Sequence, residues 1–191
     1  VLLPKRSMSS STLMATHASR LGRPLAQWLD YIESIHRRSI DLTLDRTRRV
    51  LHRLQPRLPS IVVTIAGTNG KGTTAEMLNA VYCEAGYRVG CYTSPHLVSY
   101  CERVKIDDTS VTEEDFCAAF ERVEEARSEV PLTYFEFGTI AALDLLGHAE
   151  VEVGILEVGL GGRLDAVNTI NPDLCVLTSI DLDHKAWLGS T

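Results

Sequence analysis

IVVTIAGTNGKGTT, residues 61–74, is the stretch that decides the fold. Its first part, 61–66, is an apolar and mostly β-branched run, which is typical of a strand buried on both faces. The next part, 67–72, contains three glycines and one lysine, so the backbone there can turn sharply and expose its N–H groups. We therefore predict a strand that runs into a tight glycine-rich loop.

A helix is predicted directly after this loop, over residues 73–85, with Gly86 as its stop. One stripe of that helix is apolar, and we expect it to face the core: Met77, Leu78, Val81 and Ala85. A strand, a glycine loop and a helix N-terminus in this order form a cradle for phosphate, because the helix dipole and the free N–H groups attract an anion. Lys71 adds a full positive charge to the cradle.

The loop departs from the common phosphate-loop pattern G-x-x-x-x-G-K-[ST] at two places. Ile65 stands where the pattern has its first glycine, and Gly72 separates Lys71 from Thr73. The plain alternative is a glycine-rich turn with a solvated lysine. We favour the phosphate site, because the strand–loop–helix context that the motif requires is present.

Composition limits the classes of function. The chain has 191 residues, of which 45% are hydrophobic and 23% charged, and these values are ordinary for a soluble globular domain with its own core. The net charge is −6 and no long run of Lys or Arg occurs, which argues against nucleic acid or an acidic membrane surface as the main partner. No apolar run approaches membrane-spanning length. We expect a monomer that acts on small molecules.

Cysteine usage and the first residues indicate a cytoplasmic protein. The five cysteines are odd in number and no C-x-x-C occurs, which favours reduced thiols over disulfides or a zinc site. Residues 1–20 are rich in Ser, Thr and basic residues and lack the apolar core of a signal peptide, so we interpret them as a disordered leader. The domain itself is predicted over residues 21–191.

Strands and helices alternate along the rest of the chain. The further predicted helices cover 24–37, 44–54, a segment from the capping box at 112–115 to just before Pro131, and 140–146, and the further predicted strands cover 87–93, 151–158 and 174–180. The segment 98–111 is interpreted as a solvated loop. Near-continuous apolar strands between helices predict an α/β fold with a parallel, doubly wound sheet.

Polar side chains follow four predicted strands at their carboxyl ends, the edge at which open α/β sheets bind ligands. They are Lys71 and Thr73, Ser94, Glu157, and Asp183 with His184. Taken singly, such a glutamate is often a salt-bridge partner and such a histidine a structural hydrogen bonder. Together, hard oxygen ligands and one nitrogen suit Mg²⁺ or Mn²⁺ that holds nucleotide phosphates.

Two further segments are ambiguous from residue types alone. Asp41 lies in a break between helices, where a helix cap is favoured over a ligand contact. The aromatic residues around Glu136 can hold a flat heterocycle, but composition alone favours a place in the core.

Five segments in this order resemble the dihydrofolate synthase/folylpolyglutamate synthase family, most closely its bifunctional bacterial members. They are GTNGKGTT (67–74), TSPHL (93–97), LTYFEFGT (132–139), EVGLGGRLDA (157–166) and TSIDLDH (178–184). The family is grouped with the Mur-type amino-acid ligases. The resemblance therefore implies a P-loop-type mononucleotide-binding fold similar to the central domain of those ligases.

The resemblance also implies an activity. ATP phosphorylates a carboxylate of dihydropteroate, or the terminal glutamate carboxylate of a folate such as tetrahydrofolate. The amine of L-glutamate then attacks the acyl phosphate, and phosphate leaves. Bound ATP and Mg²⁺, or Mn²⁺, are the implied cofactors.

The family's site residues carry over by position. The residues implied to bind ATP are Gly67, Thr68, Asn69, Gly70, Lys71, Gly72 and Thr73, and those implied to bind the metal are Ser94, Glu157 and His184. The residues implied to bind the pterin substrate are Ile40, Asp41, Leu42, Thr43, Thr133, Tyr134, Phe135, Glu136, Leu164, Asp165 and Ala166. The implied catalytic residues are Lys71, Glu157 and His184. This assignment reverses the interpretations that residue types alone favoured for Asp41 and for the aromatic residues.

The chain departs from the family at two points. Lys185 follows His184 where the family usually has a small hydroxyl residue, and we expect Lys185 to point away from the metal. The family also has a C-terminal glutamate-binding domain and a downstream lysine, often carbamylated, that bridges the metals. The sequence stops at Thr191, before both, so we expect an incomplete ATP-binding domain, inactive alone, with an exposed sheet edge.

Two other functions stay open from the sequence. One is a Mur-type ligase that acts on a cell-wall precursor, against which the TYFE segment argues. The other is a nucleotide-binding module without catalysis.

Overall fold

The computed structural model describes residues 22–184, 186 and 189. The leader predicted over 1–20 and the orientation predicted for Lys185 lie outside these residues. The helices are α2 (Leu25–Ile35), α3 (Asp45–Leu54), α4 (Lys71–Glu84), α5 (Glu113–Arg127) and α6 (Tyr134–His148), with 3₁₀ turns η1 (Tyr100–Arg103) and η2 (Ala166–Thr169). The strands are β1 (Ile61–Ala66), β2 (Val89–Tyr92), β3 (Val104–Ile106), β4 (Thr109–Ser110), β5 (Val153–Glu157) and β6 (Leu174–Leu177).

One sheet of six strands has the order β4-β3-β2-β5-β1-β6. Strands β2, β5, β1 and β6 are parallel, which confirms the predicted α/β architecture for the centre of the sheet. Strands β3 and β4 add an antiparallel edge beside β2, so the sheet as a whole is mixed. The prediction of a solvated loop over 98–111 is therefore wrong. Tyr100 and Val104 are buried there, and their burial holds the segment on the sheet.

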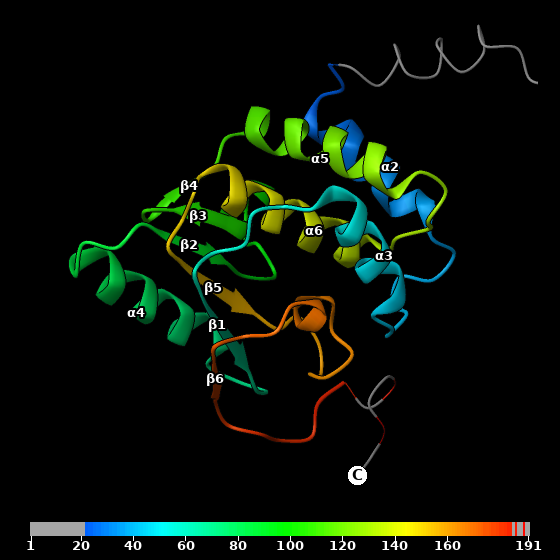
Figure 1. The fold of residues 1–191 in the computed structure, drawn as a ribbon. Helices are drawn as coiled ribbons and strands as arrows, with labels where there is room; N and C mark the ends of the chain where they lie inside the picture. Colours follow the sequence, from blue (N-terminus) through cyan, green and yellow to red (C-terminus); the bar gives the residue numbers. More distant parts are fainter. Residues whose placement is uncertain (1–21, 185, 187–188, 190–191) are drawn as a thin grey trace, which may run out of the picture.

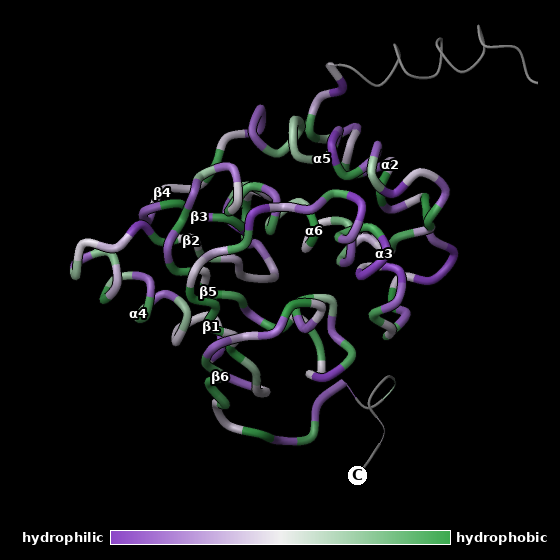
Figure 2. Tube along the Cα trace, in the orientation of Figure 1, coloured by the Kyte–Doolittle hydropathy of each residue, from purple (hydrophilic) through white to green (hydrophobic). Residues whose placement is uncertain are grey.

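Helices cover both faces of the sheet (Figure 1). Helix α4 lies on one face, whereas α2, α3, α5 and α6 lie on the other. Strand β1 serves both layers: Val62 belongs to the core cluster of the four helices, and Val63 and Ile65 belong to the cluster under α4. Figure 2 shows the apolar character of β1, β5 and much of α6 that these two clusters require. The prediction that β1 is buried on both faces is confirmed.

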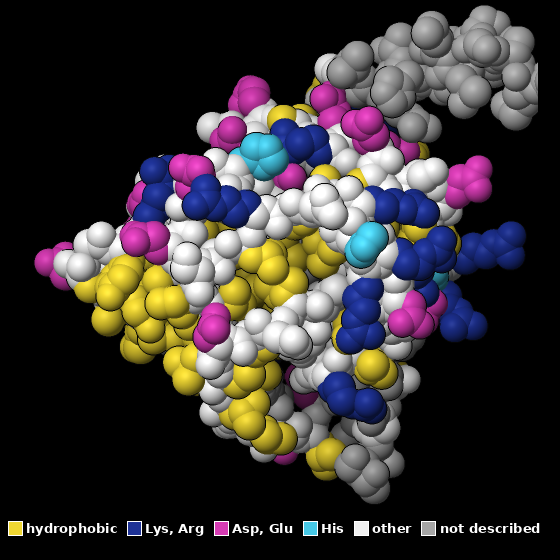
Figure 3. All heavy atoms as spheres, in the orientation of Figure 1, with side chains coloured by type: hydrophobic (Ala, Val, Ile, Leu, Met, Phe, Trp, Pro, Cys, Tyr) yellow, Lys and Arg dark blue, Asp and Glu magenta, His cyan; other side chains and the backbone are white. Residues whose placement is uncertain are grey.

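The predicted inward stripe of α4 is wrong for Met77, Val81 and Ala85, whereas Leu78 packs against the core as predicted. Ala75 and Asn79 are fully buried, whereas Met77 and Val81 are 65% and 63% exposed. Because Ala75 is small, this side of the helix lies close against the strands, and Met77 and Val81 are turned toward solvent. They contribute to the hydrophobic surface visible over α4 in Figure 3.

Two capping boxes set the starts of the long helices. The predicted one at Thr112 is confirmed, with Asp115 as its partner. A second one, at Thr133 and Glu136, starts α6 six residues before the predicted 140. Residues 134–139, which precede the predicted helix, therefore belong to α6, and this places Glu136 at a helix N-terminus.

An alanine at Gly90 is expected to destabilise the protein. Its Cβ would overlap Leu146 Cδ2, and Leu146 is fully buried on α6. We expect the free energy of unfolding to fall by about 1–3 kcal/mol, the range typical of an overpacked core. Urea denaturation measures this change. Gly162→Ala is the matched control, because nothing lies within 4 Å of its Cβ, and an equal loss in both variants would contradict the proposed packing.

Candidate functional site

The glycine loop between β1 and α4 has a shape that needs glycine. Gly67 and Gly70 have φ angles of 137° and 84°, in the left-handed half of conformational space. A Cβ on Gly67 would also overlap the hydroxyl of Thr178. The backbone of the loop therefore lies directly against the segment that follows β6.

That segment holds the loop through Thr68. The Thr68 N–H donates to Ser179 O at 2.7 Å, the Thr68 hydroxyl donates to Asp181 O at 3.0 Å, and the Asp181 N–H donates to the same hydroxyl at 2.9 Å. Both sides of the loop are thus fixed, one by β1 and the other by residues after β6.

Lys71 is the first residue of α4, and its side chain folds back over the loop. Its Nζ donates to Gly67 O at 2.9 Å and to Thr68 O at 3.3 Å. The helix N-terminus and the ammonium group therefore act at the same place, which is the arrangement that favours an anion.

A cavity of about 240 Å³ opens beside the loop, and we refer to it as the loop cavity. Of the residues predicted for ATP, Gly67, Thr68 and Lys71 line it, whereas Asn69, Gly70, Gly72 and Thr73 do not. The wall also contains residues that the prediction missed: Gly159, Gly161, Gly162, Leu177, Ile180 and Asp181. The glycines belong to the second glycine-rich loop of the sequence, which was the available signal for them.

Glu157 ends β5 beside this cradle and is 4% exposed. Its Oε2 accepts the Ser94 N–H at 2.9 Å, and its Oε1 lies 3.7 Å from the position of a Cβ built on Gly72. Burial raises the pKa of the Glu157 carboxyl, and Lys71 opposes this rise. Two of the predicted metal ligands, Ser94 and Glu157, are therefore neighbours.

The third predicted metal ligand, His184, lines the loop cavity and the larger pocket described next. Within the described part of the chain, no three His, Cys, Asp or Glu side chains form a metal-binding group. This donor set still fits Mg²⁺ or Mn²⁺, because such ions take few protein oxygens and complete their shell with phosphates and water. Ser94, Glu157 and His184 would be the residues that hold the ion.

A larger cavity, of about 280 Å³, lies beside the loop cavity, and we refer to it as the acidic pocket. It is lined by ten of the eleven residues predicted for the pterin substrate: Ile40, Asp41, Leu42, Thr43, Thr133, Phe135, Glu136, Leu164, Asp165 and Ala166. Tyr134 does not line it and faces a neighbouring hollow. The two cavities share Gly159 and His184.

Several lining residues of the acidic pocket were missed: Ser39, Pro95, Arg103, Gly159 and Leu160. Four of them are next to residues that the motifs marked, so their neighbourhood was a usable signal. Arg103 had none, because its segment looked like a solvated loop.

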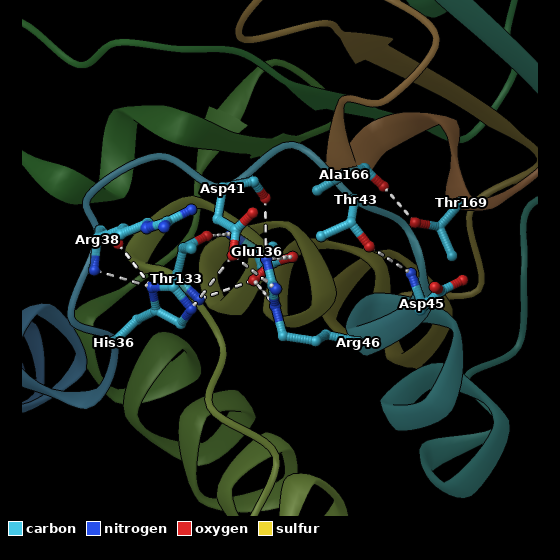
Figure 4. A network of polar contacts seen from close by, with 10 residues as sticks. All are labelled: His36, Arg38, Asp41, Thr43, Asp45, Arg46, Thr133, Glu136, Ala166 and Thr169. Carbon is cyan, nitrogen blue, oxygen red and sulfur yellow. Dashed lines mark hydrogen bonds and ion pairs between the residues drawn. The ribbon is translucent and has the colours of Figure 1, made fainter.

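Arg46 joins two carboxylates of the acidic pocket (Figure 4). It donates to Asp41 Oδ2 at 3.0 Å and Asp41 O at 2.8 Å, and to the two carboxylate oxygens of Glu136 at 2.9 and 3.1 Å. The helix-cap interpretation of Asp41 is wrong, since α3 has no side-chain cap and Asp41 pairs with Arg46 instead. This network ties the segment before α3 to the start of α6.

The aromatic residues near Glu136 divide between the pocket and the core. Phe135 lines the pocket, and a Cβ on Gly159 would come within 2.7 Å of its ring. Phe137 is fully buried and packs on Trp28 and Phe120. The pocket thus gains one flat apolar wall, and the other ring stabilises the core.

Asp165 is a buried carboxylate in the pocket wall. It accepts the N–H groups of Leu160 at 2.9 Å and Val167 at 3.0 Å. Burial raises its pKa to about 6 although these hydrogen bonds oppose the rise. The carboxyl can therefore change its charge near neutral pH.

Together these features define an α/β protein with a phosphate loop at the carboxyl edge of its sheet and a ligand pocket beside the loop. No family model matches the chain. It is 52% identical over 167 residues to the dihydrofolate synthase/folylpolyglutamate synthase of Escherichia coli K12, a match that covers 87% of this chain and 40% of that protein. The Haemophilus influenzae protein of the same name is 49% identical over 169 residues, covering 88% and 38%.

Solved structures give the same result. E. coli FolC in complex with DHPP and ADP matches with a TM-score of 0.87 at 50% identity, over 89% of this chain and 41% of that chain. A bifunctional folylpolyglutamate synthase/dihydrofolate synthase with Mn, AMPPNP and L-glutamate bound matches with a TM-score of 0.83 at 47% identity, over 89% and 41%. The chain is a homologue of the N-terminal portion of dihydrofolate synthase/folylpolyglutamate synthase and spans about two fifths of the length of these relatives. The resemblance predicted from the five motifs is confirmed.

Removal of Arg46 is expected to destabilise the fold. Arg46→Met leaves the carboxylates of Asp41 and Glu136 without their common cation, and the Glu136 side chain is only 5% exposed. A lost surface pair costs about 0–1 kcal/mol and a fully buried one about 3–5 kcal/mol, so we expect about 2 kcal/mol here. Urea denaturation measures the loss. Arg48→Met on the same helix is the control, since its 58% exposed side chain is 3.9 Å from Asp45, and equal effects would contradict the role of Arg46.

The Asp165 carboxyl is expected to lose its proton at a higher pH than an ordinary aspartate. Its pKa of about 6 in the folded chain is above 3.8, the ordinary value of an aspartate, so folding favours the protonated form. Its contribution to stability is therefore largest below pH 4 and is lost as the pH rises to about 6, by roughly 3 kcal/mol at about 1.4 kcal/mol per pKa unit. Carboxyl ¹³C NMR, with Asp165→Asn for assignment, should show a midpoint near 6 that moves toward 3.8 in denaturant. A native midpoint near 4 would overturn the expectation.

Proposed function

We propose that this chain is the ATP-binding portion of an ATP-dependent ligase that joins L-glutamate to dihydropteroate, forming dihydrofolate, and to folates such as tetrahydrofolate. The observation that carries the proposal is the pair of adjoining cavities, one at the phosphate loop and one lined by ten of the residues implied for the pterin substrate. Relatives crystallised with ADP and DHPP, and with Mn, AMPPNP and L-glutamate, support the same assignment.

In this proposal the glycine loop, residues 67–73, holds the phosphates of ATP. Backbone N–H groups at the start of α4 and the ammonium of Lys71 neutralise charge that develops as the γ-phosphoryl group moves. Lys71 is already held over the loop by two carbonyl oxygens, so it is oriented before any ligand arrives.

Ser94, Glu157 and His184 are proposed to hold Mg²⁺ or Mn²⁺. The metal supplies charge neutralisation for the phosphates when it is bound. A cation beside Glu157 would favour the ionised carboxylate, which burial alone disfavours. The Ser94 N–H fixes the Glu157 carboxylate by donating a hydrogen bond to Oε2.

The acidic pocket is proposed to take the acceptor acid. Its reacting carboxylate belongs at the end shared with the loop cavity, where Gly159 and His184 lie. The flat heterocycle then lies against Phe135 and within reach of Asp165. A carboxylate oxygen attacks the γ-phosphorus and ADP leaves; the amine of glutamate then attacks the acyl carbon and phosphate leaves.

The whole activity is proposed for a protein longer than this chain, because the relatives have more than twice its matched length. Alone, this chain is proposed to bind ATP without completing the reaction. The monomeric state and the cytoplasmic location are part of the same proposal. Within the described residues no helix is long and apolar enough to cross a membrane, and the five cysteines are free.

Lys71→Ala is expected to weaken ATP binding to this chain at least tenfold, because a charge-assisted contact contributes about 1.5–3 kcal/mol and 1.4 kcal/mol is tenfold in affinity. Calorimetric titration with ATP and Mg²⁺ measures it. Lys105→Ala is the control, since Lys105 pairs with Glu76 on β3 and α4 and lines neither cavity. Equal affinity of wild type and Lys71→Ala would contradict the proposed loop function.

The catalytic part is tested on a protein in which this chain is continued by the remaining portion of a relative. Phosphate release should then depend on both dihydropteroate and L-glutamate, and Lys71→Ala should abolish it. Release that depends instead on a UDP-muramyl peptide would establish a cell-wall ligase. ATP binding with no acceptor-dependent release would leave only a nucleotide-binding module.

A further inference from the structure

One basic side chain in the wall of the acidic pocket pairs with no carboxylate among the residues that the structure describes. Of the three carboxylates in its wall, Asp41 and Glu136 are paired with Arg46. Arg103 also lines the pocket, is 8% exposed, and forms no ion pair with any described residue. A buried guanidinium is costly unless its charge is compensated, and the side chains that meet its N–H groups, His96 and Tyr92, carry no negative charge.

Arg103 is fixed by three rings. Its Nε donates to His96 Nδ1 at 2.9 Å, and its guanidinium lies 5.0 Å from the centre of the Tyr100 ring and 5.8 Å from that of Tyr134. The Tyr100 ring is itself packed edge-on against His96 and Tyr134. The guanidinium also interacts with the buried hydroxyl of Tyr92, so this support uses the Nε, the faces and part of the polar edge of the guanidinium.

The place of Arg103 in the pocket indicates which end of a ligand it meets. Arg103 is absent from the lining of the loop cavity, where the reacting carboxylate belongs. It packs instead on Tyr134, which lines a neighbouring hollow together with Ser39 and Phe135, two residues of the acidic pocket. The terminal N–H groups of Arg103 are therefore suited to the flat end of the acceptor and not to its acid group.

We propose that Arg103 is a specificity-determining residue that donates hydrogen bonds to an electron-rich atom of the acceptor's heterocycle, a ring carbonyl oxygen or ring nitrogen, and that His96 positions it. This inference rests on the proposed function. A guanidinium supported on aromatic faces selects a flat, acceptor-bearing ring over an aliphatic substituent, because two N–H donors in one plane match acceptors in one plane. The pocket then reads the heterocycle by a donor, Arg103, and an acceptor, Asp165.

Arg103→Met tests this, since methionine keeps much of the apolar stem and removes the donors. We expect it to weaken binding of dihydropteroate about ten- to hundredfold in calorimetric titration, as for the loss of a charged hydrogen bond. Binding of p-aminobenzoate, which has the acid end without the heterocycle, should stay unchanged in NMR titration. ATP affinity should also stay unchanged and verifies that the variant is folded.

Two further variants sharpen the result. Arg103→Lys keeps the charge and loses the planar fork, so its affinity for dihydropteroate should fall between wild type and Arg103→Met, even if the methionine variant proves unstable. Arg53→Met is the control, because Arg53 binds the carbonyl oxygens of Ala126 and Arg127 outside the pocket, and its affinities should equal those of wild type.

The outcomes separate the inference from the function on which it rests. Equal dihydropteroate affinity in wild type and Arg103→Met overturns the role of Arg103 and leaves the proposed function intact. Equal losses for dihydropteroate and p-aminobenzoate overturn it as well, because they show a contact with the acid end or a structural effect. If wild type binds neither compound, the proposed function itself fails, and the inference with it.

Discussion

The site depends on the close contact between the glycine loop and the segment after β6. Gly67 has no room for a side chain beside Thr178, and Thr68 is bonded to Ser179 and Asp181 through backbone and hydroxyl. The loop cavity lies between these two segments. Without the contact, the loop would keep its sequence but lose one wall of the cradle.

The acidic pocket follows from a different constraint, the need to neutralise carboxylates that are drawn away from water. Arg46 neutralises Asp41 and Glu136, and by binding both it fixes the segment before α3 against the start of α6. Asp165 is fixed by backbone N–H groups instead, and its raised pKa shows that this is an incomplete compensation. The contacts that compensate the buried carboxylates therefore also fix the shape of the pocket.

Much of the fold could be predicted because its strands carry a local signal. The apolar run of β1, the glycines after it and the capping box of α5 depend on neighbouring residues only, and these predictions are confirmed. The inward face of α4 could not be predicted from the sequence, because it depends on how closely Ala75 approaches the strands. The β3–β4 edge was missed because its short strands are stabilised by the distant core around Tyr100.

The order of strands in the sheet has a consequence for how the chain folds during its synthesis. Strand β5 lies between β1 and β2, although it follows them by about sixty residues or more in the chain, and β6 then pairs with the other side of β1. Pairing over such separations is slow, because a long loop must close before any contact is gained. During synthesis the glycine loop emerges early but stays without Glu157 and without its partner segment 178–181 until both have left the ribosome. The proposed nucleotide site is therefore completed late in synthesis, when the last described strand has joined the sheet.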